Sequence, residues 1–247
     1  MSEELIILNL VVFGAAVLQS AAGFGFGVVA GPVLLLQMNS ADAVTVSILL
    51  NLVVAGVLTP TLWPYRAKVL LNKLVISSLL GLPLGVWILI SIDFVTLKLL
   101  AGIAVLLAAI SVLWRRPETQ AIDDEAGDRG AIPFLIGGLA GVMGGSLAMP
   151  GPAPAAWMAK HDYGKQSVRS TILALFLFVY AGALILHIGI NGFLASVLWQ
   201  SAALLPATLV GIYVGGRLVG HLSESFFKGL ILIVLAGSAG SLFWSIL

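Results

Sequence analysis

The sequence predicts an all-α, polytopic membrane protein made of two inverted repeats, each a broken hairpin segment followed by three transmembrane helices. Three observations support this fold class. Of the 247 residues, 60% are hydrophobic and only 9% are charged, whereas a soluble domain has about 25% charged residues. Six apolar runs have the length of about 20 residues that a membrane-spanning helix needs. Two further apolar runs are interrupted by glycine and proline.

The composition also excludes several classes of protein. A soluble enzyme could not bury this much apolar surface. With 12 Lys and Arg against 11 Asp and Glu, the chain has no basic surface for a nucleic acid. The absence of cysteine excludes disulfides and thiolate metal centres. We expect no cofactor and no metal.

Six segments are expected to cross the membrane as simple helices. In chain order they are residues 43–63, 70–91, 95–114, 167–187, 193–218 and 226–247. Two other apolar stretches, residues 5–38 and 131–159, contain breaks. The first is interrupted by Gly23-Phe24-Gly25-Phe26-Gly27, and the second by Gly144-Gly145-Ser146 and then Pro150-Gly151-Pro152-Ala153-Pro154. Because glycine weakens a helix and proline removes a backbone donor, we expect two half-helices around each break.

A polar linker at residues 115–130 divides the chain into a first repeat, 1–114, and a second, 131–247. An offset of 130 positions pairs Gly81 with Gly211, Gly85 with Gly215, Lys98 with Lys228 and Trp114 with Trp244. A weaker offset of 123 positions pairs Gly14 with Gly137 and Ser47 with Ser170. These pairs indicate an internal duplication.

Charge then favours one topology, because cytoplasmic loops carry the excess of Lys and Arg. If both broken segments cross the membrane, the 12 basic residues divide evenly between the two sides. If each segment returns to its own side as a hairpin, all of them except Lys98 share one side. We therefore expect both termini outside the inner membrane and the linker in the cytoplasm. A topology in which only residues 131–159 form a hairpin separates charge equally well but breaks the repeat symmetry.

The breaks are the candidate substrate site, because non-helical backbone at membrane depth is tolerated only in protein or along a cavity. Half-helix N-termini present free N–H groups and roughly half a positive charge, which suits a small anion. Glycines let a ligand approach the backbone, neutral polar groups donate hydrogen bonds, and Phe24, Phe26 and Trp157 form an apolar wall. The predicted substrate-binding residues are Gln19, Ser20, Gly23, Gly25, Gly27, Asn51, Gly144, Gly145, Ser146, Pro150, Gly151, Trp157 and Arg169.

Each of these roles has a structural alternative. The glycines at small-xxx-small spacing, Gly81, Gly85, Gly211 and Gly215 above all, favour helix packing. Arg169 either holds an entering anion or extends to the interface as a topology anchor. Asn51 either faces the cavity or joins helices. No mid-membrane Asp, Glu or His relay is evident, so a facilitated mechanism fits, and coupling to H+ or Na+ stays open.

In this order, the motifs resemble the sulfite exporter TauE/SafE family, also called the toluene sulfonate uptake permeases. The resemblance covers nearly the whole chain. It rests on Gly23 to Gly27 with Gly31-Pro32, on Gly141-Val142-Met143-Gly144-Gly145 before Pro150, and on the two glycine-paired helices with Lys98 and Lys228. The proline-rich run at 150–154 departs from the glycine-rich second motif of the family. The resemblance implies a permease for sulfite, sulfonates or related organic anions.

Other functions remain open from sequence. An anion channel of the same fold would use the breaks as a filter, and a carrier would also suit a non-sulfur organic anion. An intramembrane serine hydrolase would need Ser146 within hydrogen-bond reach of His187 or His221, which we do not expect because these histidines are predicted at a helix end and in a loop. We therefore expect no enzyme activity. The oligomeric state, a homodimer included, is not fixed by the sequence.

Overall fold

The computed structural model describes residues 3–113, 130–161, 163–192 and 195–218, with 236, 237 and 240. Within these ranges every regular element is a helix. The helices are α1 (Glu3–Ala22), α2 (Phe26–Met38), α3 (Asp42–Leu62), the short η1 (Trp63–Tyr65), α4 (Lys68–Ser91), α5 (Phe94–Leu113), α6 (Ile132–Leu147), α7 (Pro152–Lys160), α8 (Lys165–Asn191) and α9 (Ala195–Leu218). The predicted span 226–247 and the linker before residue 130 lie outside the described residues, apart from those three positions.

Helices are present at each simple span predicted within these ranges, as α3, α4, α5, α8 and α9, with bounds that differ by a few residues. Among the described residues, five helices are long and apolar enough to cross a membrane, namely α1, α3 continued by η1, α4, α8 and α9. Crossing of the membrane by α5 stays a prediction. Their outer faces are apolar as well. Leu80 on α4 is 76% exposed and Trp199 on α9 is 80% exposed. Such side chains fit a lipid environment better than water.

The first predicted break is confirmed, but its helices are not both half-helices. Gly23 and Gly25 have φ angles of 85° and 125°, where glycine is favoured, and they separate α1 from α2. However, α1 has 20 residues and a length of about 30 Å. The expectation of a half-helix there is wrong, because nothing before Gly23 ends the helix. Only the 13-residue α2 is short.

The second break lies later than predicted. Gly144, Gly145 and Ser146 remain inside α6, and the non-helical residues are 148–151. The glycines do not interrupt the helix because they pack against neighbours. A Cβ built on Gly145 would lie 2.8 Å from the carbonyl oxygen of Leu82 in α4. Ala148 ends α6 in the left-handed region, with φ 56°, and Pro152 starts α7.

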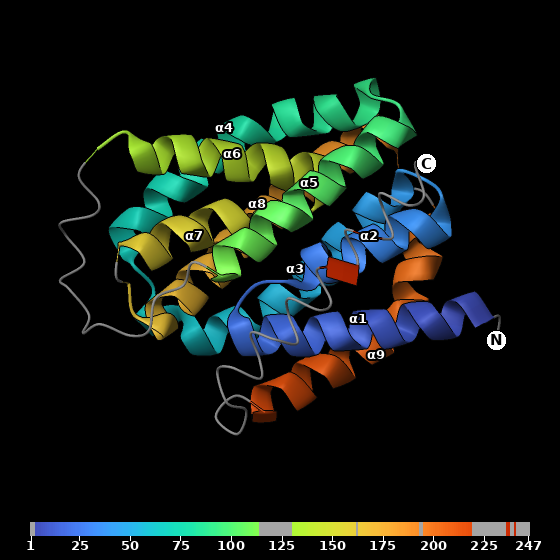
Figure 1. Cartoon of the computed structure of the whole chain (residues 1–247), viewed down its shortest axis with the longest axis horizontal. Coiled ribbons are helices and arrows are strands. Elements are labelled where there is room, and N and C mark those ends of the chain that lie inside the picture. The colour runs from blue at the N-terminus through green and yellow to red at the C-terminus, as the bar shows by residue number, and fades with distance from the viewer. Residues whose placement is uncertain are drawn as a thin grey trace.

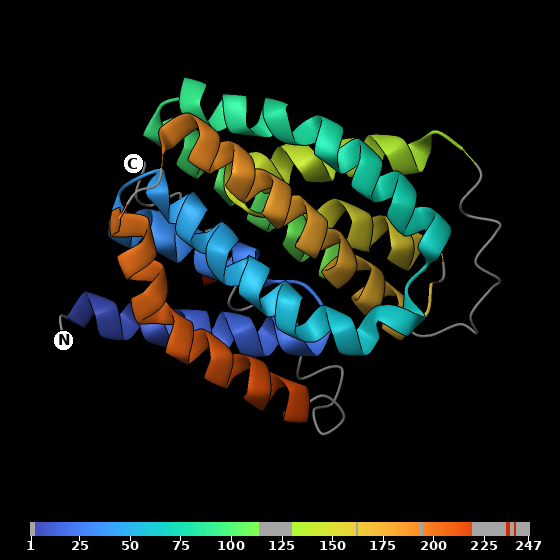
Figure 2. The ribbon, with the colours of Figure 1, turned by 180° about the vertical axis from the view of Figure 1, so that it is seen from behind.

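The two broken segments enter the bundle from opposite ends. Figure 1 shows α1 running away from the N-terminus and α2 returning toward it, while α6 and α7 make the same hairpin from the other end. The view from behind in Figure 2 shows the same arrangement, with α3 and α8 crossing the bundle between them. The turns of both hairpins therefore lie in the interior.

Each hairpin packs most extensively against a helix of the other half, α6 against α4 and α1 against α9. Glycines make these contacts close. A Cβ on Gly81 or Gly85 would lie 2.3 Å from a carbonyl oxygen of α6, and one on Gly211 or Gly215 would lie 2.5 Å from a carbonyl oxygen of α1. Hydrogen bonds repeat the pattern. Ser78 Oγ donates to the Gly137 carbonyl at 2.8 Å, and Ser20 Oγ donates to the Ile212 carbonyl at 2.9 Å. The packing role predicted for the four paired glycines is confirmed.

Candidate functional site

The two breaks contact each other in the centre of the bundle. A Cβ built on Gly27, in the first turn of α2, would lie only 2.1 Å from the carbonyl oxygen of Ala148. The same oxygen accepts a hydrogen bond from Tyr180 Oη at 3.0 Å. Ala148 is the C-cap of α6, so its carbonyl has no amide partner within that helix and accepts from outside it. One backbone oxygen thus joins α2, α8 and the second break.

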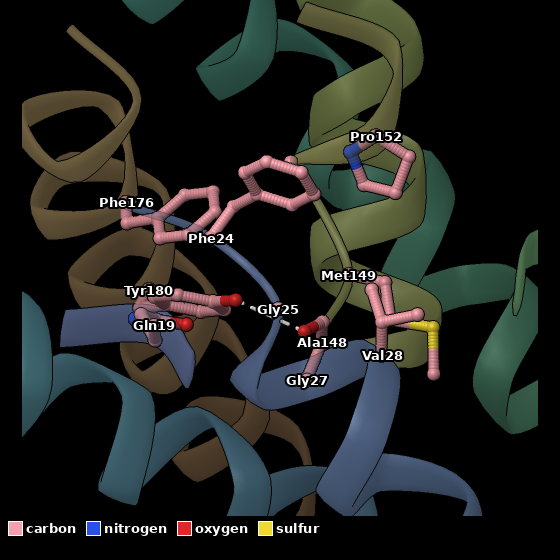
Figure 3. A pocket seen from close by; sticks show the side chains of 11 residues that line it. Gln19, Phe24, Gly25, Gly27, Val28, Ala148, Met149, Pro152, Phe176 and Tyr180 are labelled. Atoms are coloured by element: carbon pink, nitrogen blue, oxygen red, sulfur yellow. Dashed lines mark hydrogen bonds between the residues drawn. The ribbon is translucent and has the colours of Figure 1, made fainter. Parts of the chain in front are cut away.

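A small cavity of about 10 Å³ lies at this junction. Figure 3 shows its walls, which come from three parts of the chain. The first hairpin supplies Gln19, Phe24, Gly25, Gly27 and Val28, the second supplies Ala148, Met149, Gly151 and Pro152, and α8 supplies Phe176 and Tyr180. The volume has room for about one water molecule. The site is therefore closed in this structure and too small for a multi-atom anion.

Two buried amide side chains beside the breaks have unused hydrogen-bonding capacity. Gln19 is fully buried, and its Oε1 accepts from the Phe26 N–H at 3.0 Å, while Nε2 has no partner. Asn51 on α3 is also fully buried, and its Nδ2 donates to the Ser47 carbonyl at 2.9 Å, while Oδ1 has no partner. Asn51 Nδ2 lies 3.6 Å from the Cβ position of Gly27. Because buried polar atoms are usually paired, these atoms are candidates for a ligand or a moving backbone.

The two helix N-termini at the breaks differ in their supply of donors. In α2 the first intrahelical bond runs from the Val29 N–H to the Gly25 carbonyl at 2.9 Å, so the amides of Gly27 and Val28 precede the ladder. In α7 the equivalent first bond runs from the Ala155 N–H to the Gly151 carbonyl. Pro152 and Pro154 have no N–H to offer. The positive end of α2 is therefore the better anion-binding terminus.

Of the residues predicted for the site, the cavity brings together Gln19, Gly25, Gly27 and Gly151. The others do not line it. Ser20 bonds to α9, as described above, and Ser146 Oγ donates to the Val142 carbonyl at 2.7 Å within α6. A Cβ on Gly144 would meet Val179. Trp157 stacks on His161 at 4.1 Å, near the far end of α7. Pro150 lies in the second break without lining the cavity, and Asn51 stands behind Gly27.

Arg169 lies at the end of α1 and not in the cavity. Its Nη2 donates to the Ser20 carbonyl, and its side chain covers Gly23, where a Cβ would lie 2.6 Å from Cγ. The end of a helix carries partial negative charge, so a guanidinium is favourable there. Arg169 Nε is buried and has no partner. In this structure Arg169 caps α1, and its roles in holding an anion or anchoring the topology stay predictions.

The sequence analysis missed several residues that line the cavity, Val28 and Met149 among them, and it misplaced His187. Phe176 and Tyr180 were not expected, although their spacing puts both on one face of α8. The Ala148 carbonyl carried no sequence signal. His187 was predicted at a helix end, but α8 continues to Asn191 and His187 is buried. Its Nε2 lies 2.9 Å from the Gly145 carbonyl, so Nε2 carries the proton, and Nδ1 accepts from Thr45 Oγ1 at 2.9 Å.

These contacts also bear on chemistry. Within the described part of the chain, His187 and Ser146 each bond to other groups, so this pair makes no nucleophile–base hydrogen bond. The described residues contain no cluster of three or more His, Asp or Glu that could hold a metal ion.

Comparison with known proteins gives one match. The family model described as sulfite exporter TauE/SafE matches residues 8–242. The matched range includes both breaks and α2 to α9 in full. No curated protein and no solved structure matches the chain.

Proposed function

From its membership of the TauE/SafE sulfite exporter family, we propose that this chain is a secondary transporter or facilitator for a small sulfur-containing anion, sulfite or a sulfonate, in the inner membrane. The observation that carries the proposal is the meeting of the two breaks at one cavity. Broken helices are costly in a membrane and are typical of substrate sites in transporters. The positive end of α2 at this cavity suits an anion.

The proposal includes the topology. Both hairpins are re-entrant, the halves are inverted repeats, the termini face outside and the linker is cytoplasmic. Charge supports it. The connections α3–α4 and α7–α8 lie at the end of the bundle where α6 begins (Figure 1), and they carry Arg66, Lys68, Lys160 and Lys165. The α4–α5 connection, which precedes Lys98, lies at the opposite end. The excess of basic residues is expected on the cytoplasmic side.

Transport requires the site to open. The cavity of about 10 Å³ has room for about one water molecule, so it must widen to take a sulfur anion. Separation of the hairpin tips, at the contact between Gly27 and Ala148, would open a path past Gly25 or past Gly151. A contact that must separate during each transport event favours a carrier over an open pore.

The test is uptake of labelled sulfite and of a labelled sulfonate into proteoliposomes that contain the purified protein. A carrier is expected to show saturation with concentration and counterflow after preloading with unlabelled anion. Linear uptake without counterflow would instead identify an anion channel. Absence of uptake for both sulfur anions, in protein that is monodisperse in detergent, would contradict the proposal, and uptake of a carboxylate would then point to a non-sulfur organic anion.

A further inference from the structure

Resting on the proposed function, we infer that the transported anion binds as a monoanion in the place now held by the Ala148 carbonyl oxygen, where it accepts the hydrogen bond of Tyr180. Before the anion binds, the carbonyl oxygen would occupy the position of an anion oxygen beside Tyr180 and Gly27. Binding would then displace the second break from α2, which couples occupancy to movement of the hairpin tip.

The position of the carbonyl oxygen is that of a bound anion. It lies against Gly27, in the first turn of α2, where free amides and the helix dipole favour negative charge. It accepts a hydrogen bond from the hydroxyl of Tyr180, a side chain that is 1% exposed. Its own residue has the left-handed φ of 56°, which is unfavourable for an alanine. Release of Ala148 would relieve that strain, while Tyr180 and the α2 terminus would need a new acceptor.

Glycine at position 27 fits this role. Any side chain there would fill the space that the oxygen occupies, since its Cβ would lie 2.1 Å away. Asn51 Nδ2 lies 3.6 Å from the same Cβ position. Gln19 Oε1 already holds the Phe26 N–H, which keeps the start of α2 fixed beside the cavity. The subsite is therefore formed on the α2 and α8 side before the anion arrives.

The charge of the surroundings selects the substrate class. The cavity lining contains no Lys, Arg, His, Asp or Glu. Among described charged or titratable groups, α8 contributes Lys165 as its first residue, Arg169 bonded to the Ser20 carbonyl, Tyr180, and His187 bonded to Gly145. The charged residues of α1 and α7 lie at the helix ends away from the cavity, and α2 has no acidic residue in its first turn and no basic residue in its last. A helix terminus supplies roughly half a positive charge, and the cost of burying an ion grows steeply with its charge. The site suits hydrogensulfite or a sulfonate, and it disfavours the sulfite dianion and sulfate.

The first experiment removes the hydroxyl. Tyr180→Phe keeps the ring and deletes the donor, so the KM for a sulfonate should rise by about tenfold or more, because a hydrogen bond to a charged group is lost. The maximal rate should change less. Thr208→Val is the matched control, since it deletes a buried hydroxyl that bonds within α9 at 3.0 Å. If Tyr180→Phe leaves the KM unchanged in a transporting protein, the inference is wrong although the proposed function stands.

The second experiment needs only the wild-type protein. Sulfite uptake should rise as the pH falls through neutrality, because the hydrogensulfite fraction rises, whereas methanesulfonate uptake should stay level over the same range. The methanesulfonate series corrects for titration of protein groups such as His187. Sulfate should compete poorly with labelled methanesulfonate. Sulfate competition as strong as that of unlabelled methanesulfonate would refute a monoanion site. Sulfite uptake that falls as the hydrogensulfite fraction rises would refute it too. No uptake of either sulfur anion would instead count against the proposed function.

Discussion

The Gly27→Ala substitution tests the contact between the two breaks most directly. The added methyl carbon would lie 2.1 Å from the Ala148 carbonyl oxygen, whereas a carbon–oxygen contact needs about 3.3 Å. Either α2 or the second break must therefore retreat by about 1.2 Å. The hydrogen bond from Tyr180 Oη to the same oxygen, now 3.0 Å, would stretch beyond hydrogen-bond length if the carbonyl moves.

The magnitude follows from three contributions. Overpacking a close contact costs about 1–3 kcal/mol, and loss of the Tyr180 hydrogen bond costs about 1 kcal/mol. Replacing glycine by alanine in a helix returns up to about 1 kcal/mol. We expect a net destabilisation of about 1–3 kcal/mol by these values. Because the methyl group also fills the proposed anion subsite, sulfonate uptake should fall by much more than the loss of stability alone explains.

The assay combines melting temperature in detergent with uptake into proteoliposomes. Gly14→Ala is the matched control, because it adds the same methyl group to α1, where a Cβ meets nothing within 4 Å. The control should melt at or slightly above the wild-type temperature, because alanine favours the helix more than glycine does, and it should transport like the wild type. A Gly27→Ala protein that matches Gly14→Ala in both measurements would refute the reasoning, since the breaks could not then be in close contact.

Three further predictions follow from contacts elsewhere in the fold. Gly85→Ala puts a methyl 2.3 Å from the Val142 carbonyl oxygen, so the melting temperature should fall by an amount equivalent to about 1–3 kcal/mol while the KM stays unchanged. An altered KM with normal stability would contradict a purely packing role. The chain has no cysteine, so single cysteines can be introduced and labelled with an impermeant maleimide. Cysteines that replace Lys160 and Asp124 should react from one side of the membrane, and a cysteine that replaces Asp93 should react from the other. If the cysteines at positions 160 and 93 react from the same side, the proposed topology is excluded. The Thr96 hydroxyl and then the Thr96 amide hold the pKa of Asp93 below its ordinary value. A lowered pKa in the folded state means that this carboxylate stabilises the fold above its unfolded pKa and that the contribution is lost as the pH falls through the folded pKa. NMR titration should therefore show that Thr96→Val raises the pKa of Asp93, and an unchanged value would show that the hydroxyl has no effect on it.

Much of the fold was predictable because bilayer thickness and backbone chemistry limit it. Apolar length alone identified α3, α4, α5, α8 and α9, and glycine and proline identified both breaks. Paired glycines at small-xxx-small spacing predicted the close packing that Gly81 and Gly211 make. These signals are local in the chain, and the membrane leaves few alternatives for them.

The rest depends on tertiary contacts that have no local signature. Gly144 and Gly145 look like helix breakers, yet they stay in α6 because α4 and α8 pack closely on that side. Ser146 is adjacent in sequence to the second break, but its hydroxyl turns back to α6. The oxygen of Ala148 belongs to the backbone, so the type of residue at this position could not predict its place in the site. Tyr180 reaches the cavity from a helix whose sequence indicates only an ordinary span.

The exchange of partners between halves has a consequence for how the chain is made. Helix α1 is synthesised long before α9, the helix it packs along. The carbonyl that accepts from Ser20 Oγ lies 192 residues later in the chain. Until α9 inserts, the face of α1 that later packs against Gly211 and Gly215 is exposed to lipid or to the insertion machinery. In the described part of the chain, the two most extensive helix pairs, α4 with α6 and α1 with α9, each join one half to the other. A half translated alone therefore lacks these contacts. Assembly is therefore completed only after the second half has inserted, and a chain cut in the linker should regain its fold when both pieces are produced together.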